Sequence, residues 1–130
     1  MSKTSPAQLD AETLKGHAIT ALEDTKAQDI ATLDVRGISD VADFLLIATG
    51  TSDRHVGAVA RNLVDDLRDK HGERPIGVEG EGSGADWILI DYGVIIVHVM
   101  REETRSYYDL DTLWGERARE LLLQHQQQQP

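Results

Sequence analysis

The sequence predicts a single α/β domain: a mixed β-sheet of about five strands flanked by helices. Apolar runs of strand length occur in both halves of the chain, and an amphipathic helical pattern lies between them. The chain has 130 residues, of which 40% are hydrophobic, which suits one domain with a single core. The predicted order is α-β-β-α-β-β-β-α, which implies helices packed on the faces of the sheet.

The N-terminal third contributes a helix and a half-buried strand. Residues 1–7 are polar and are expected to form a disordered lead-in. Helical spacing of apolar residues predicts a helix over Leu9–Lys26. In Asp29–Val35, apolar residues alternate with Thr32 and Asp34, which is the pattern of a strand with one buried face.

The middle of the chain contains the clearest strand and the clearest helix. Phe44–Thr49 is nearly all apolar and too short for a good helix, so we expect a central strand covered on both faces. After the turn Gly50–Ser52, apolar residues form one helical stripe: Val56, Val59, Ala60, Leu63, Val64 and Leu67. Thr51 or Ser52 is a suitable N-cap, and His71-Gly72 is expected to end the helix.

The following segment is predicted to complete the sheet. Pro75–Glu79 is a short strand candidate, and the Gly-rich, acidic stretch Glu79–Ala85 is expected to be a mobile loop. Trp87–Ile90 and Val94–Met100 are predicted to form an antiparallel hairpin joined through Asp91-Tyr92-Gly93.

The C-terminal end is expected to be less regular. Arg105–Trp114 is predicted to form one or two helical turns at the end of the sheet. A short helix is expected to reach Leu123, and the glutamines and proline of 126–130 are expected to be disordered.

The composition excludes several function classes. The net charge is −10 and the pI about 4.8, which argues against direct nucleic-acid binding, because phosphate contacts require clustered Lys and Arg. The chain has no cysteine, so disulfides and thiolate chemistry are excluded. The longest apolar run, Val94–Val97, is far too short to cross a bilayer, and we expect a cytoplasmic protein.

The turn Gly50–Ser52 could hold a phosphate on free backbone N–H groups at the start of a helix. Nucleotidyltransferases place a Gly-Ser pair at such a turn, with paired carboxylates on a following strand. The nearest carboxylates are Glu79 and Glu81, which flank glycines in the expected loop and lack a rigid support. Ordinary helix capping is therefore favoured, and an enzyme of this type is the alternative.

His98 lies in the middle of a predicted strand, with Asp86 and Asp91 within reach across the hairpin. An Asp–His pair could act in acid–base chemistry, but no serine or cysteine is placed beside it as a nucleophile. Strand periodicity puts His98 on the same face as Ile96 and Met100, which favours a structural or interface histidine. The other histidines have no metal-ligand spacing, and neither a metal nor a cofactor is expected.

Aromatic and acidic residues gather in the same part of the chain. Five of the six aromatic side chains lie between Trp87 and Trp114, and Glu79–Glu120 contains ten acidic residues against four arginines. Binding interfaces concentrate their energy in Trp, Tyr and Arg anchors within polar rims. We interpret the cluster as a surface for a basic, partly apolar partner, with Trp87 as the exposed anchor. Core packing is the alternative, and it is expected for Trp114 and one tyrosine.

Three runs carry a resemblance to a known family: ADFLLIATGTSDRHV at 42–56, GVEGEGSGADWILIDYGVIIVHVM at 77–100, and RSYYDLDTLW at 105–114. In order and spacing they resemble the ribosomal silencing factor family, RsfS, also known as Iojap-like. The resemblance covers roughly residues 14–115. It implies a domain over 8–115, with residues 116–130 as a C-terminal extension that ends in the Gln-rich disordered tail.

The resemblance implies a translation factor without enzymatic activity. Family members bind the large ribosomal subunit through ribosomal protein L-fourteen, block joining of the small subunit and lower translation under nutrient limitation. It further implies a nucleotidyltransferase-like sheet without the active site, and a homodimer when the protein is free.

The family motif places the partner surface at the predicted hairpin. The expected contact residues are Asp86, Trp87, Asp91, Tyr92, Gly93, His98 and Met100, with Trp87 and Tyr92 as apolar anchors and the two aspartates facing basic groups. Val94 departs from the family pattern, which commonly has Asp after the turn glycine. This difference weakens a charged contact or strengthens an apolar one.

Overall fold

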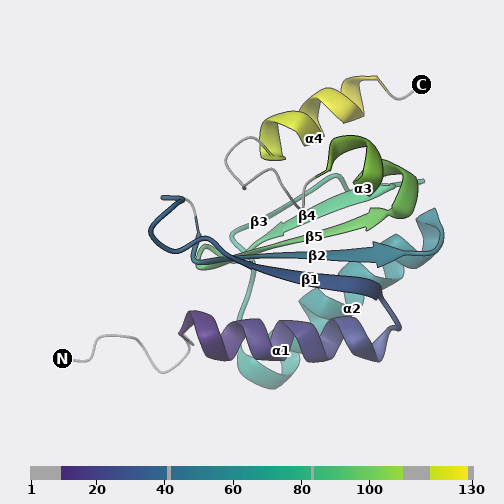
Figure 1. Cartoon of the computed structure of the whole chain (residues 1–130). Coiled ribbons are helices and arrows are strands. Elements are labelled where there is room, and N and C mark those ends of the chain that lie inside the picture. The colour runs from purple at the N-terminus through teal and green to yellow at the C-terminus, as the bar shows by residue number, and fades with distance from the viewer. Residues whose placement is uncertain (1–9, 41, 83, 110–117, 129–130) are drawn as a thin grey trace.

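The computed structural model describes residues 10–40, 42–82, 84–109 and 118–128, and it contains a five-stranded sheet with helices on both faces (Figure 1). The strand order is β1-β2-β5-β4-β3. In chain order, the elements are α1 (Ala11–Asp24), β1 (Gln28–Asp34), β2 (Phe44–Gly50), α2 (Asp53–His71), β3 (Gly77–Glu79), β4 (Trp87–Asp91), β5 (Ile95–Arg101), α3 (Glu102–Tyr108) and α4 (Ala118–Gln127).

The sheet is mixed because its central pair is parallel and every other pair is antiparallel. β2 and β5 pair in parallel from Phe44 opposite Ile95 to Gly50 opposite Arg101. β1 joins the free side of β2, while β4 and then β3 join the free side of β5, all antiparallel. Every residue of β2 is buried. The predicted central strand, the hairpin and the mixed sheet of five strands are therefore confirmed.

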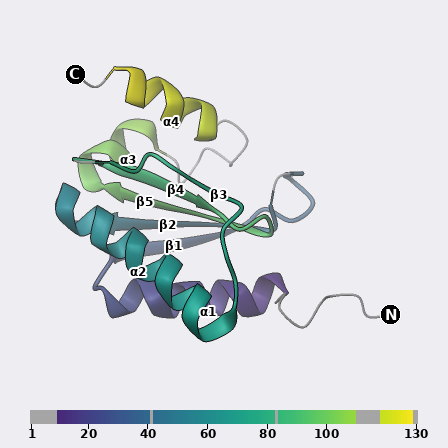
Figure 2. The same ribbon diagram turned by 180° about the vertical axis from the view of Figure 1, so that it is seen from behind.

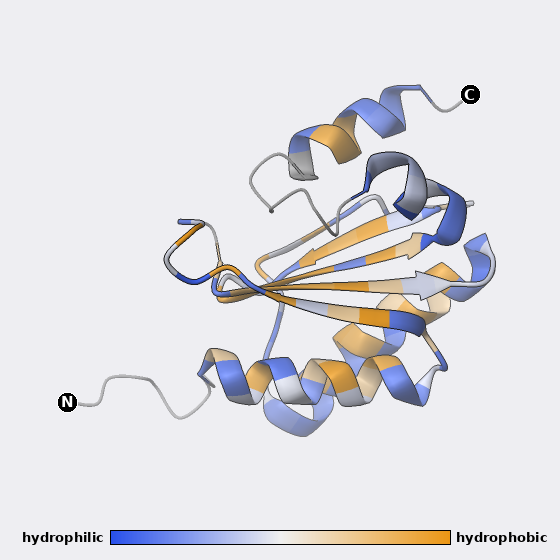
Figure 3. Ribbon diagram, viewed as in Figure 1, coloured by the Kyte–Doolittle hydropathy of each residue, from blue (hydrophilic) through white to orange (hydrophobic). Residues whose placement is uncertain are grey.

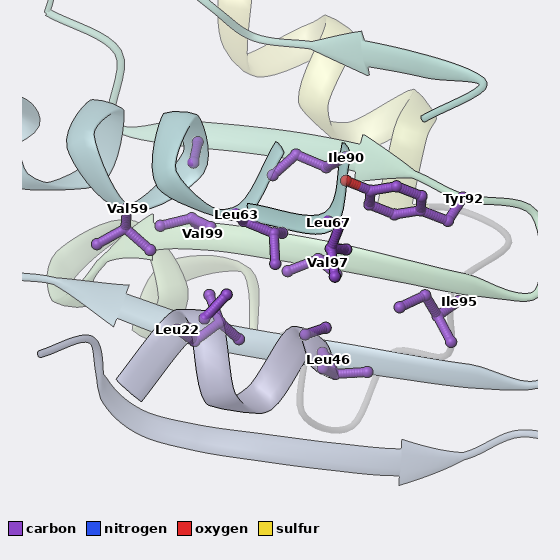
Figure 4. Packing of buried hydrophobic residues seen from close by; sticks show 14 of the residues in the cluster. Leu22, Leu46, Val59, Leu63, Leu67, Ile90, Tyr92, Ile95, Val97 and Val99 are labelled. Atoms are coloured by element: carbon purple, nitrogen blue, oxygen red, sulfur yellow. The ribbon is translucent and has the colours of Figure 1, made fainter. Parts of the chain in front are cut away.

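Helices α1 and α2 cover one face of the sheet, as the two opposite views show (Figures 1 and 2). Ser52 caps α2 by accepting a hydrogen bond from the His55 N–H, and Gly72 ends it in a left-handed conformation. The apolar stripes of α1 and α2 pack against the strand residues that point to this face of the sheet. Figure 4 shows the resulting core, which includes Leu22, Leu46, Val59, Leu63, Leu67, Val97 and Val99.

Helices α3 and α4 lie on the opposite face. A second, smaller apolar cluster is buried here: Leu45, Ile47, Trp87, Leu89, Ile96, Met100 and Leu122. α4 is largely hydrophilic, with a single apolar stretch, whereas apolar residues run along the central strands (Figure 3). The two layers are therefore unequal, and α1 with α2 supplies the larger core.

The C-terminal end differs from the prediction. The expected helix does not stop at Leu123 but continues as α4 to Gln127, so disorder was wrongly predicted for Gln126 and Gln127. Glutamine is a good helix former, and the attachment of Leu122 and His125 to the sheet side holds this helix in place. The predicted lead-in 1–7 and Trp114 lie outside the described residues.

Histidines that are far apart in the sequence meet between α1 and α2. The rings of His17 and His71 stack with their centroids 3.6 Å apart and an interplanar angle of 17°. Burial, followed by the nearby His17 charge, lowers the pKa of His71 below its usual 6.5. The folded state therefore binds this proton less readily than the unfolded state does.

This pair predicts a pH dependence of stability. Because the pKa of His71 is lower in the folded state, its neutral form stabilises the fold above pH 6.5, and this stability is lost as the pH falls. When the pH is lowered from about 7.5 to about 5.5, the melting temperature of His71→Gln should fall by less than that of the unsubstituted protein. Thermal denaturation across this range measures the difference. Parallel curves for the two proteins would contradict it.

Gly50 predicts a second measurable effect. A Cβ atom here would lie 2.7 Å from Val56 Cγ2 and 2.9 Å from the Val56 backbone nitrogen. Gly50→Ala should therefore lower the free energy of unfolding by roughly 1–3 kcal/mol, since the backbone of α2 must shift. Gly16→Ala is the control, because nothing lies within 4 Å of its added Cβ and alanine favours a helix by about 1 kcal/mol. Urea denaturation of both variants tests the opposite signs.

Candidate functional site

Strand register brings three of the predicted partner residues to one face of the sheet. Trp87 pairs with Met100 across β4 and β5, and Leu89 pairs with His98. Paired residues on adjacent strands point to the same side, so Trp87, His98 and Met100 share the face covered by α3 and α4. The predicted grouping of His98 with Ile96 and Met100 is therefore confirmed.

Trp87 is buried rather than exposed, with 1% of its surface accessible. Its Nε1–H donates a 3.0 Å hydrogen bond to His98 Nδ1, and its ring lies 5.0 Å from the ring of Tyr108 and 5.9 Å from that of His125. The prediction of an exposed anchor is wrong in this conformation. The indole has an internal acceptor for its N–H, and side chains from α3 and α4 cover its ring.

His98 has a structural role on the buried face of the sheet. Its Nδ1 accepts the bond from Trp87, which requires this nitrogen to be unprotonated. Asp86, which the sequence suggested as a partner for His98, instead accepts hydrogen bonds from the Thr104 hydroxyl and from His125. The geometry supports the structural interpretation of His98 over acid–base chemistry.

His125 forms the centre of a polar cluster that attaches α4, and we refer to Asp86, Tyr108 and His125 as the latch. His125 Nε2 lies 2.9 Å from both carboxylate oxygens of Asp86, and its Nδ1 lies 3.0 Å from the Tyr108 hydroxyl. A neutral imidazole with its proton on Nε2 satisfies both contacts, donating to Asp86 and accepting from Tyr108. His125 was not predicted from the sequence as a site residue, although its spacing of three residues from the buried Leu122 puts both on one helical face.

Tyr92 lies away from Trp87. It belongs to the core between the sheet and the helices α1 and α2, as Figure 4 shows, and burial, followed by the charge of Glu73, raises the pKa of its hydroxyl. The expectation that Trp87 and Tyr92 anchor one surface is therefore wrong, because they lie on opposite faces of the sheet.

Asp91 and Gly93 form the hairpin turn. Asp91 Oδ1 accepts a 2.8 Å hydrogen bond from the Gly93 N–H, and Gly93 has a φ of +85°, which favours glycine. Val94 is next in the chain and partly exposed. Asp91 is half-buried at this turn.

Arg105 anchors α3 to the sheet, a role that sequence analysis did not identify. Its Nη1 donates to the Asp29 carbonyl at 2.7 Å and to Thr49 Oγ1 at 2.8 Å. These bonds tie α3 to both β1 and β2, and so hold Tyr108 above Trp87.

The turn Gly50–Ser52 forms a helix cap whose groups bond internally. The Thr51 N–H donates to His55 Nδ1, and Ser52 Oγ accepts from the His55 N–H. His55 Nε2 lies 2.7 Å from the Thr25 carbonyl oxygen, so the same ring links α2 to the end of α1. The capping interpretation of this turn is therefore supported.

Within 10–40, 42–82, 84–109 and 118–128, no group of three or more His, Asp or Glu side chains could hold a metal ion. Over the same part of the chain, no helix has the length and apolar character needed to cross a membrane. Among the described residues, the candidate site therefore consists of the Trp87–His98 pair and the latch above it.

A family model described as "Ribosomal silencing factor during starvation" matches residues 8–130. The chain belongs to the ribosomal silencing factor family. It is 44% identical over 99 residues to ribosomal silencing factor RsfS of Bacillus subtilis, covering 76% of this chain and 82% of that protein. The resemblance seen in the sequence is therefore confirmed, and the family is one of regulatory proteins.

More distant relatives and solved structures are also similar to this chain. A mouse protein named "Mitochondrial assembly of ribosomal large subunit protein 1" is 33% identical, with 77% of this chain and 44% of that protein covered. A crystal structure of a protein from Chromobacterium violaceum superposes with a TM-score of 0.77 at 38% identity, covering 82% of this chain and 88% of that one. A Bacillus halodurans structure gives 0.71 at 37% identity, covering 79% and 94%. Likeness to nucleotidyltransferases stays a prediction.

The Trp87–His98 bond predicts a stability effect. Trp87→Phe removes the donor and leaves the buried His98 Nδ1 without it, so the free energy of unfolding should fall by at least about 2 kcal/mol. Tyr107→Phe is the control, because Tyr107 is 79% exposed and should change stability by less than about 0.5 kcal/mol. Urea denaturation of both variants measures this, and equal midpoints would contradict the role of the bond.

Proposed function

We propose that this family member binds the large ribosomal subunit through ribosomal protein L-fourteen in the cytoplasm. By occupying the face that meets the small subunit, it blocks subunit association and represses translation under nutrient limitation. The observation that carries this proposal is the family match over residues 8–130. When free, the protein is proposed to form a homodimer.

The chemistry of the chain supports a basic protein partner. The net charge of −10 favours encounter with a positively charged surface, and Asp86 and Asp91 offer carboxylates at the two ends of β4. Between them lie the large apolar side chains of the sheet. A partner that joins basic groups to an apolar residue fits this combination.

The contact set remains the one expected from the sequence: Asp86, Trp87, Asp91, Tyr92, Gly93, His98 and Met100. The structure gives its members different roles in this proposal. Asp91 and Gly93 are half-buried at the turn. Trp87 and Met100 form the apolar floor, which is the buried surface beneath α4, and His98 fixes the indole. Tyr92 supports the turn from the opposite side.

The alternative, a nucleotidyltransferase-like enzyme using the turn Gly50–Ser52, has less support. The N–H groups of Thr51 and His55 bond to side chains of the same turn. Glu79 lies on the edge strand β3, and Glu81 lies in the loop that follows it. A thermal shift caused by nucleotide with magnesium would favour this enzyme.

Sedimentation through sucrose gradients tests the proposal. Purified subunits are combined with and without the protein, and each fraction is blotted for it. We expect the protein to travel with the large subunit and to reduce the amount of intact ribosomes. Recovery at the top of the gradient, with subunit joining unchanged, would overturn the proposal.

Removal of one carboxylate gives a sharper prediction. Asp91→Asn keeps an oxygen to accept from the Gly93 N–H but removes the charge, so binding to the large subunit should weaken roughly fivefold and become less sensitive to salt. Glu23→Gln is the matched control, because it removes one charge from an exposed position on α1. Equal weakening in both variants would indicate a general charge effect rather than a contact at Asp91.

A further inference from the structure

Among the described side chains of α4, few apolar ones reach the sheet. Leu122 is fully buried and Leu121 packs beside it, but Leu123 is 47% exposed. By contrast, α1 and α2 each bury a full stripe of apolar residues along their length. A helix held by so few apolar contacts can open at much lower cost than the core can unfold.

Among the described residues, the latch also attaches α4. His125 bonds to Asp86 and Tyr108, and its ring packs against Trp87 and Tyr108. One residue of α4 therefore occupies both the carboxylate and the aromatic surface beneath it. Release of α4 would free these groups together.

The covered groups coincide with the proposed contact surface. Leu122 packs in the same cluster as Trp87 and Met100, and His125 holds Asp86. A partner with a basic side chain and an apolar side chain would make the same contacts. Its basic group would bind Asp86, and its apolar group would fill the apolar seat, which is the position that Leu122 occupies against Trp87 and Met100. The helix and such a partner cannot occupy this surface at the same time.

We propose that α4 is an autoinhibitory cover that must leave the sheet before the apolar floor at Trp87 and the carboxylate of Asp86 can engage a basic protein partner. This inference rests on the proposed function, since it names the regulation of that binding surface. It assigns a role to the C-terminal helix, which lies beyond the three sequence runs that carry the family resemblance.

Closure of α4 lowers the apparent affinity for the partner, because only the open fraction of the protein can bind. When the binding-competent form is a fraction of the population, the apparent dissociation constant rises by the inverse of that fraction. A cover closed for nine-tenths of the time would weaken binding about tenfold. Weakening the attachment of α4 should therefore strengthen partner binding, which is the opposite of what loss of an interface residue would do.

The experiment compares two substitutions in the full-length protein. Leu122→Asp places a charge in the apolar seat, and Leu123→Asp places the same charge next to it at an exposed position. Hydrogen exchange of the isolated proteins reports whether the amides of α4 and β4 lose protection. Titration against purified large subunits in sucrose gradients gives the affinity of each.

We expect Leu122→Asp to lose protection in α4 and to bind large subunits at least roughly fivefold more tightly, with Leu123→Asp within about twofold of the unsubstituted protein. His125→Ala should shift both readouts in the same direction as Leu122→Asp, and it preserves the apolar seat.

Three outcomes would overturn the proposal that α4 is an autoinhibitory cover. Unchanged or weaker binding by a Leu122→Asp protein whose α4 has opened would show that the helix does not compete with the partner. Unchanged protection of α4 in that variant would show that Leu122 does not hold the helix. If the unsubstituted protein and every variant fail to bind large subunits, the proposed function fails as well, and this distinguishes the two ideas.

Discussion

The parallel pairing of β2 with β5 sets the requirements for the rest of the fold. Both strands are apolar on both faces, and every residue of β2 is buried. A parallel pair of this kind needs a covering layer on each side, because neither face can be left to water. The helices α1 and α2 provide one layer with an extensive core, and the second face receives the shorter helices α3 and α4.

Polar groups within the second layer give it a defined geometry. Trp87 and His98 satisfy each other beneath α4, and Arg105 satisfies Thr49 and the Asp29 carbonyl where α3 begins to cross the sheet. Each bond fixes a side chain that an apolar layer of the same size would leave free to repack. The layer is thus small in apolar area but specific in arrangement.

The fold was predictable to the extent that local patterns determine it. The stripe of α2, its cap at Ser52 and its end at Gly72 follow from residue spacing and chemistry, and the hairpin follows from alternation around Gly93. The end of α4 was predicted wrongly, because its attachment depends on contacts with residues distant in sequence. Glutamine-rich composition carries no record of such contacts.

The candidate site was predictable in its residues but not in its exposure. Motif position identified Trp87, His98 and Met100, and strand register confirmed that they share a face. Whether a tryptophan at a strand end is covered depends on what packs there, and His125 lies far away in the chain. By contrast, the separation of Trp87 from Tyr92 was predictable, because residues five apart along an extended strand point to opposite faces of the sheet.

The same central pair also orders events during the synthesis of the protein. β2 and β5 are neighbours in the sheet, yet α2, β3 and β4 lie between them in the chain. Until residue 101 has emerged from the ribosome, β2 has β1 on one side and an open apolar edge on the other. Such an edge invites pairing with other chains, and non-local strand pairing is slow to form. A member of this ribosome-regulating family therefore closes its own core only after β5 has been synthesised.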